Sequence, residues 1–181
     1  MATLLRILIF ASIGWMGFQI LLVGYRTKIK SLGRPPIAWP ALLLAKIGAG
    51  VSFTWMLWQA ASGKVELSWA STVLFLILLL GGTLIITSAL FRLGKNLRMG
   101  LPVEETTLIT SGIYRFSRNP IYVAVFCVMG ASLVYAFSWV NLGAVVASVC
   151  LHHRIVLAEE KFLAGQFKDY ETYRKRVRRY L

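Results

Sequence analysis

The sequence predicts an all-α integral membrane bundle of five transmembrane helices, followed by a cytoplasmic, amphipathic C-terminal helix. Apolar residues make up 57% of the 181 residues and charged residues only 15%, against about 25% charged in soluble domains. The mean hydropathy is +0.68, the reverse of the low hydrophobicity that keeps disordered chains from collapsing. Five apolar runs are long enough to cross a bilayer. Because the bilayer core holds no water, such a run must form a helix, in which the backbone makes its own hydrogen bonds. These observations exclude a soluble globule and a disordered chain.

The first two spans are expected at residues 4–25 and 39–61. The first is longer than the apolar core of a signal peptide, about 7 to 15 residues, so we expect it to be retained. Pro35 and Pro40 suit the entry to the second helix, because proline lacks an amide donor and fits a first helical turn. Lys46 lies near that entry, and its ammonium is expected to snorkel back to water.

The third span is expected at residues 67–91. Residues 92–120 follow as a long polar stretch with glycine, proline and several charges, and such a stretch cannot cross the bilayer. Residues 121–137 and 140–157 are expected to form the last two spans, joined by a tight turn. The tail, residues 157–181, has a helical pattern with four acids among seven Lys and Arg, which predicts the water-facing amphipathic helix.

Loop charges predict the orientation of this single membrane domain. The second loop has Lys64 beside Glu66 and the fourth has no charge, whereas the first and third loops are basic. Their basic residues are Arg26, Lys28, Lys30, Arg34, Arg92, Lys95, Arg98, Arg115 and Arg118. Because basic loops stay cytoplasmic, the N-terminus is expected outside and the C-terminus in the cytoplasm. The net charge of +13 then indicates anionic membrane lipids as partners and not nucleic acid.

Two polar segments, residues 108–122 and 152–173, flank the last predicted hairpin at its cytoplasmic ends. Antiparallel helices pack about 8 to 10 Å apart, so one pocket is expected to hold side chains from both segments. Cys127 and Cys150 lie in apolar stretches and are expected to be small buried hydrophobes. We predict no metal site, because no Cys or His spacing fits a ligand set.

The two segments carry a spaced pattern of glycine, aromatic and charged residues. It reads Leu108-x3-Gly112-x-Tyr114-x3-Arg118-Asn119-Pro120-x-Tyr122, then Arg154-x4-Glu159-Glu160-x2-Leu163 and Tyr170-x2-Tyr173. Over about residues 93–173 this pattern resembles the isoprenylcysteine carboxyl methyltransferase and phospholipid methyltransferase family of integral membrane enzymes. Asn119 stands where the fuller motif has His, and Asn does not titrate near neutral pH, so no proton shuttle is expected there. Ala124 and Gln166-Phe167 are further departures.

The resemblance implies S-adenosylmethionine as cofactor and a catalytic region at about residues 93–181, with a lipophilic small molecule or lipidated substrate entering from the bilayer. Carried over by motif position, the expected cofactor-binding residues are Leu108, Gly112, Tyr114, Arg118, Asn119, Pro120, Tyr122, Glu159 and Glu160.

The chemistry of the side chains gives each a candidate role. Arg118 suits the cofactor's carboxylate, which a guanidinium binds through two parallel hydrogen bonds. Glu159 or Glu160 suits the ammonium, and since neighbouring helical residues point about 100° apart, one should face the pocket and the other solvent. Arg154 and Glu160 are the expected catalytic residues, and Arg154, Tyr173 and Arg174 the expected substrate-binding residues. His152 and His153 are not assigned between catalytic and interfacial roles.

The acceptor's nucleophile decides what else the site requires. A carboxylate is ionised at pH 7, so an arginine such as Arg154 that positions it suffices. An amine must lose a proton, and Glu160 or a histidine would then act as base. We expect O-methylation of a prenylcysteine-like carboxylate, with a phospholipid amine as the alternative. An NADPH-dependent membrane lipid reductase and a non-catalytic membrane subunit remain open, and no oligomeric state is predicted.

A basic run closes the sequence and is expected to contact anionic lipid at the cytoplasmic surface. Such charges contribute about 1 kcal/mol each near an anionic membrane. The run consists of Arg174, Lys175, Arg176, Arg178 and Arg179.

Overall fold

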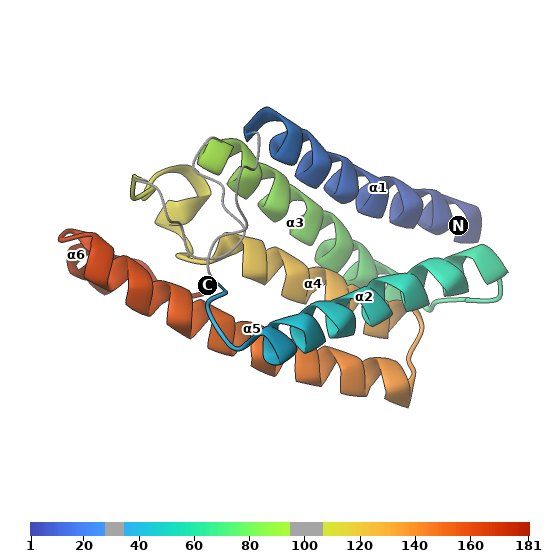
Figure 1. The fold of residues 1–181 in the computed structure, drawn as a ribbon. Helices are drawn as coiled ribbons and strands as arrows, with labels where there is room; N and C mark the ends of the chain where they lie inside the picture. The colour runs from blue at the N-terminus through green and yellow to red at the C-terminus, as the bar shows by residue number, and fades with distance from the viewer. Residues whose placement is uncertain (28–34, 95–106) are drawn as a thin grey trace.

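The computed structural model describes residues 1–27, 35–94 and 107–181, and these residues form helices without any strand (Figure 1). Five long helices follow one another: α1 (Ala2–Thr27), α2 (Trp39–Ser62), α3 (Trp69–Leu93), α4 (Pro120–Tyr135) and α5 (Trp139–Gln166). The 3₁₀ turn η2 (Gly112–Arg115) precedes α4, and the short helix α6 (Tyr170–Arg176) follows α5. The all-helical class is thereby confirmed.

Four of these helices are long and apolar enough to cross a membrane, namely α1, α2, α3 and α5. Helix α4 is apolar but has only 16 residues. Large apolar side chains are exposed along the bundle, among them Leu21 at 75% and Ile77 at 63%, as expected for a surface that faces lipid. The chain is a multi-pass membrane protein. Of the residues that predict its orientation, Lys28, Lys30, Arg34, Lys95 and Arg98 lie outside the described ranges.

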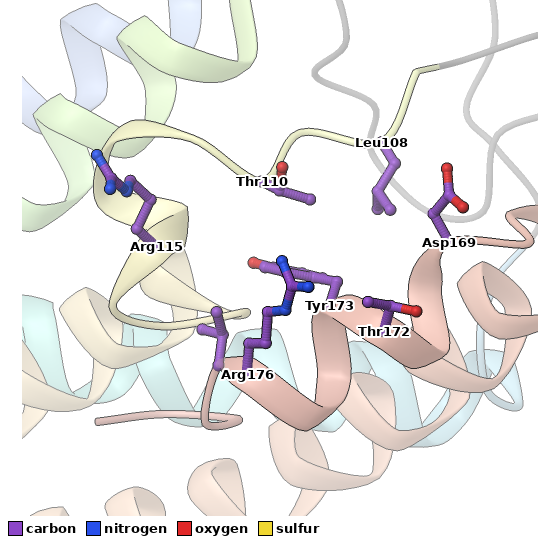
Figure 2. Close-up of a pocket in the computed structure, with 8 residues that line it drawn as sticks. Leu108, Thr110, Arg115, Asp169, Thr172, Tyr173 and Arg176 are labelled. Atoms are coloured by element: carbon purple, nitrogen blue, oxygen red, sulfur yellow. The ribbon is translucent and has the colours of Figure 1, made fainter.

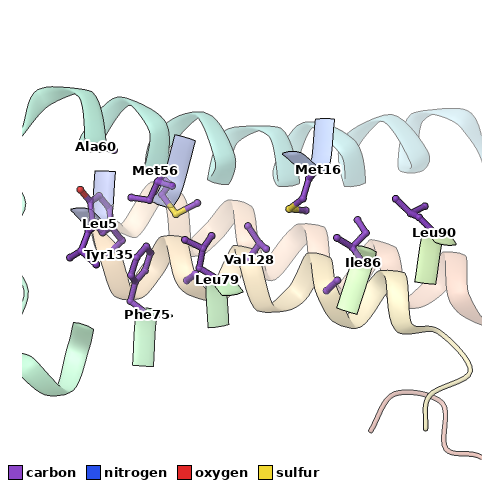
Figure 3. Close-up of a cluster of buried hydrophobic side chains, with 13 residues drawn as sticks. Leu5, Met16, Met56, Ala60, Phe75, Leu79, Ile86, Leu90, Val128 and Tyr135 are labelled. Carbon is purple, nitrogen blue, oxygen red and sulfur yellow. The ribbon is translucent and has the colours of Figure 1, made fainter. Parts of the chain in front are cut away.

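The helices pack in two close pairs, α3 with α4 and α2 with α5. Figure 3 shows the apolar core, in which Phe75 and Leu79 of α3 lie near Val128 of α4 and Met56 of α2. Gly82 permits the first pair to approach closely, because a Cβ there would lie 3.0 Å from the carbonyl oxygen of Ala124. Small residues at such contacts are the usual basis of helix packing in lipid. This packing brings the start of α4 beside the end of α5.

The C-terminal region differs from the single amphipathic helix predicted for residues 157–181. Helix α5 continues to Gln166, because residues 158–166 contain no proline and are mostly good helix formers. Phe167 then adopts extended backbone angles and ends the helix. After α6, Val177 is again extended, and the chain turns back toward the start of α4. The tail therefore consists of the end of α5, the short helix α6, and a last segment that runs back to the start of α4.

Candidate functional site

A buried ion pair joins the start of α4 to the last turns of α5. The guanidinium of Arg118 donates to Glu160 through Nε to Oε1 at 3.1 Å and through Nη2 to both carboxylate oxygens at 3.0 Å. The two side chains are only 7% and 8% exposed. A pair removed from water in this way is stable only if further hydrogen bonds compensate the loss of hydration.

Two more side chains supply those hydrogen bonds to Glu160. Asn119 donates through Nδ2 to Oε1 at 2.8 Å, and Arg179 donates through Nε to Oε2 at 3.0 Å. The Glu160 carboxylate thus accepts from three side chains, two of them cationic. Arg118, Asn119 and Glu160 are the predicted motif residues that the fold brings into direct contact.

Residues 177–180, which we call the C-terminal strap, cover the other side of this pair. Arg118 Nη1 donates to the carbonyl oxygens of Val177 at 2.6 Å and Arg174 at 3.1 Å. The backbone amide of Arg118 donates to the carbonyl oxygen of Arg178 at 3.0 Å. Asn119 Nδ2 and Ser117 Oγ donate to the carbonyl oxygen of Arg179 at 3.1 and 3.3 Å. The backbone amide and all three guanidinium nitrogens of Arg118 therefore donate hydrogen bonds within the protein.

Glu159 lies on a different side of α5 and meets α4. Its Oε1 accepts a hydrogen bond from the hydroxyl of Tyr122 at 3.0 Å. The ring of Tyr122 in turn meets the buried His152 edge-on, with ring centroids 5.8 Å apart. The expectation that one glutamate faces solvent is therefore wrong. Glu159 meets α4 on one side of α5, and Glu160 meets the strap on another side.

Three tyrosines pack beside the ion pair. Tyr173 donates to the carbonyl oxygen of Tyr114 at 2.7 Å, which ties α6 to η2. Tyr170 is 1% exposed, and among the described residues its hydroxyl has no hydrogen-bond partner. Burial raises the pKa of Tyr170 to about 12 and raises the pKa values of Tyr114 and Tyr173 above their ordinary range. All three remain protonated donors at neutral pH.

A pocket of about 480 Å³ opens between the segment before η2 and α6 (Figure 2). Figure 2 shows Arg115 and Asp169 at opposite ends of it, with Tyr173 and Arg176 between them. Its lining residues are Leu108, Thr110, Arg115, Asp169, Thr172, Tyr173, Arg176 and Val177. The volume lies within the range of about 300 to 1,000 Å³ that small-molecule sites occupy. Because Val177 also accepts from Arg118, the pocket and the ion pair are neighbours.

The remaining predicted residues take different places. Pro120 is buried in the first turn of α4. Gly112 has a φ of +66° and packs against the side chain of Arg92, so it shapes η2 and does not line the pocket. Arg154 is exposed on α5. Arg174 is exposed and pairs with Glu171 at 3.3 Å.

The contributions of the strap are not predicted from the sequence. Arg179 belongs to a run that is expected to contact lipid, whereas the structure places its side chain on Glu160. Tyr180, for which no role is predicted, has its hydroxyl 2.7 Å from His153 Nδ1. Spacing alone does not separate Arg179 from its basic neighbours, so nothing in the pattern distinguishes it.

The fold and this site define a multi-pass helical membrane protein with a buried charged cluster, beside a pocket, where α4 begins and α5 ends. A model of the phospholipid methyltransferase family matches residues 70–170, more than half of the chain. The chain belongs to this family, within the group of integral membrane methyltransferases that also includes the isoprenylcysteine carboxyl methyltransferases. The resemblance in the sequence is thereby confirmed. No curated protein and no solved structure matches the chain.

Proposed function

We propose that this protein transfers a methyl group from S-adenosylmethionine to a lipophilic acceptor at the cytoplasmic face of its membrane. The observation that carries the proposal is the Arg118–Glu160 pair, which joins two halves of a methyltransferase motif beside a pocket of suitable size. The methyl-transfer region would be residues 93–181 of one membrane domain.

The side chains around the pair fit the groups of this cofactor. Its amino-acid end is a zwitterion, for which Tyr170 offers a buried hydroxyl without a partner among the described residues. Arg118 offers Nη1, once this group exchanges the carbonyl oxygens of Arg174 and Val177 for the cofactor's carboxylate. Both residues lie close to Glu160, since the charges of Arg118 and Glu160 act on the pKa of Tyr170. Leu108 and Tyr173 offer apolar and aromatic walls for the adenine. When bound, the cofactor supplies an electrophilic methyl group on its sulfonium.

The two glutamates divide the remaining work. Glu160 already accepts from three side chains, so its role is to hold Arg118 in place for the cofactor's carboxylate. Glu159 accepts from Tyr122 alone among the described residues, so it retains capacity to accept from the cofactor's ammonium. Gly112 and Pro120 act through the backbone and the shape of the site, and Asn119 acts through its hydrogen bond to Glu160.

The two candidate methyl acceptors would require different side chains. A prenylcysteine-like carboxylate would be oriented by Arg154, whose exposure leaves its guanidinium available, with Arg174 and Tyr173 nearby on α6. A phospholipid amine would instead give up its proton to a base such as His153, whose Nδ1 is hydrogen bonded to the Tyr180 hydroxyl. Labelled methyl transfer into extracted lipid separates the two, because base releases the label from a methyl ester and not from an N-methylamine.

The proposed topology has five spans, with α4 as the fourth and the basic segments on the cytoplasmic side. The N-terminus then lies outside, and the strap and α6 lie at the cytoplasmic surface near anionic lipid. Impermeant thiol labelling of single cysteines placed at Gly63 and at Lys175 in sealed vesicles tests this arrangement. The two positions should label from opposite sides, and labelling from one side would contradict the topology.

Calorimetry on the purified protein tests the activity. S-adenosylmethionine should release binding heat, and Arg118→Ala should weaken its affinity at least tenfold. The control is Lys161→Ala, which removes an exposed cation next to Glu160 and should leave the affinity unchanged. Heat with NADPH alone would favour a reductase, and heat with neither compound would favour a non-catalytic subunit.

A further inference from the structure

The C-terminal strap contacts both the segment ahead of α4 and the last turns of α5. Its carbonyl groups accept from Ser117, Arg118 and Asn119 ahead of α4. Its side chain Arg179 reaches Glu160 on α5. The strap is therefore the only described segment that binds both members of the buried ion pair.

Arg179 has a particular place in this arrangement. Oε2 of Glu160 accepts from Arg118 Nη2 and from Arg179 Nε, both at 3.0 Å. The Arg179 side chain is 34% exposed, against 8% for Glu160. A second cation on the outer side fixes the rotation of the Glu160 carboxylate, and the carboxylate in turn fixes the guanidinium of Arg118.

Tyr180 anchors the end of the strap at two helices. Its hydroxyl is hydrogen bonded to His153 Nδ1 of α5 at 2.7 Å, and its ring meets Phe126 of α4 edge-on with centroids 5.7 Å apart. The backbone is therefore anchored on both sides of Arg179, which places its side chain beside Glu160.

We propose that Arg179 is a positioning residue of the methyl-transfer site, which holds Glu160 and through it the Arg118 guanidinium that binds the carboxylate of the methyl donor. This inference rests on the proposed function and extends it to a residue beyond the family pattern. Binding sites lose strength steeply when a binding group is misplaced by about 1 Å. The strap therefore acts on affinity for the donor and not on the acceptor.

The test compares Arg179→Gln and Arg179→Lys with the control Lys161→Gln, which removes an exposed charge from α5. Arg179→Gln should weaken S-adenosylmethionine binding at least tenfold in calorimetry. It should raise the donor's KM similarly while kcat and the acceptor's KM stay within about twofold. Arg179→Lys retains a cation and a donor, so it should bind within about threefold of the wild type. Lys161→Gln should match the wild type.

The outcomes separate this inference from the proposed function. Absence of donor binding by the wild-type protein would overturn the function, and this inference with it. Wild-type binding combined with unchanged binding by Arg179→Gln would overturn this inference alone. A fall in kcat at constant KM would also contradict it, since that result indicates a smaller folded fraction. If Arg179→Gln does not fold, Tyr180→Phe decides, because loosening the strap should weaken donor binding about threefold and an unchanged affinity refutes the proposal.

Discussion

Two ion pairs in the C-terminal half use the same chemistry in opposite surroundings. Arg118 and Glu160 are 42 residues apart in sequence, with side chains 7% and 8% exposed. Arg174 and Glu171 are three residues apart on α6, with side chains 54% and 57% exposed. The first pair accumulates additional donors from Asn119 and Arg179, whereas the second has one contact of 3.3 Å.

The difference teaches that burial, and not the presence of opposite charges, identifies the candidate site. An exposed pair contributes about 0 to 1 kcal/mol, because water already solvates both charges. A buried pair is maintained only where packing and extra hydrogen bonds enforce it, and breaking one partner costs about 3 to 5 kcal/mol. Breaking the Arg118–Glu160 pair should therefore lower the free energy of unfolding much more than breaking the Arg174–Glu171 pair on α6.

The largest expected effect comes from neutralising each acid in turn. Glu160→Gln should lower the free energy of unfolding in detergent by about 3 to 5 kcal/mol, because it leaves the buried Arg118 and the partly exposed Arg179 against a neutral amide. Glu171→Gln should change it by less than about 0.5 kcal/mol. Denaturant titrations monitored by circular dichroism measure both. Equal losses would remove the distinction between the two pairs.

A smaller effect should follow from removing a neutral donor from the buried pair. Asn119→Ala takes away one hydrogen bond to Glu160 and one to the strap, so we expect a loss of about 1 to 3 kcal/mol. Asn119→Asp should be worse, because it sets a second carboxylate against the first. The same denaturant titration checks both variants, and an aspartate variant as stable as the wild type would contradict the geometry.

The smallest effect concerns salt. A double-mutant cycle on Arg174 and Glu171 should give a coupling energy of about 0.5 kcal/mol or less at low ionic strength, and about none at 1 M salt, where charges are screened over about 3 Å. The coupling between Arg118 and Glu160 should persist, because water and ions do not reach it. Loss of both couplings in salt would show that the second pair is also hydrated.

Much of the fold could be predicted from apolar run lengths. The second span was predicted at residues 39–61 and is observed as Trp39–Ser62, and the third at 67–91 and is observed as Trp69–Leu93. The end of α5 was missed, because the periodic charges after residue 157 suit a water-facing helix equally well whether it is continuous or separate. Residues 158–166 contain no proline, and packing against α4 and the strap keeps Glu159 and Glu160 on the same helix as the span.

For the candidate site, the sequence predicts which side chains lie close together better than it predicts their contacts. Motif spacing brought Arg118, Asn119, Tyr122, Glu159 and Glu160 together, and the structure joins them in two hydrogen-bonded groups. Spacing did not reveal that Arg118 and Glu160 bind each other, because a pairing over 42 residues depends on how the start of α4 packs beside the end of α5. Arg179 was indistinguishable from its basic neighbours, because its contact with Glu160 depends on the return of the chain after α6.

The brevity of α4 has a consequence for the surrounding lipid. Sixteen helical residues rise only about 24 Å, whereas the hydrocarbon layer of a bilayer is about 30 Å thick. A short span is accommodated by thinning of the adjacent leaflets. If α4 spans the membrane as proposed, we expect headgroups to lie deeper beside Tyr122 and nearer to the proposed methyl-transfer site.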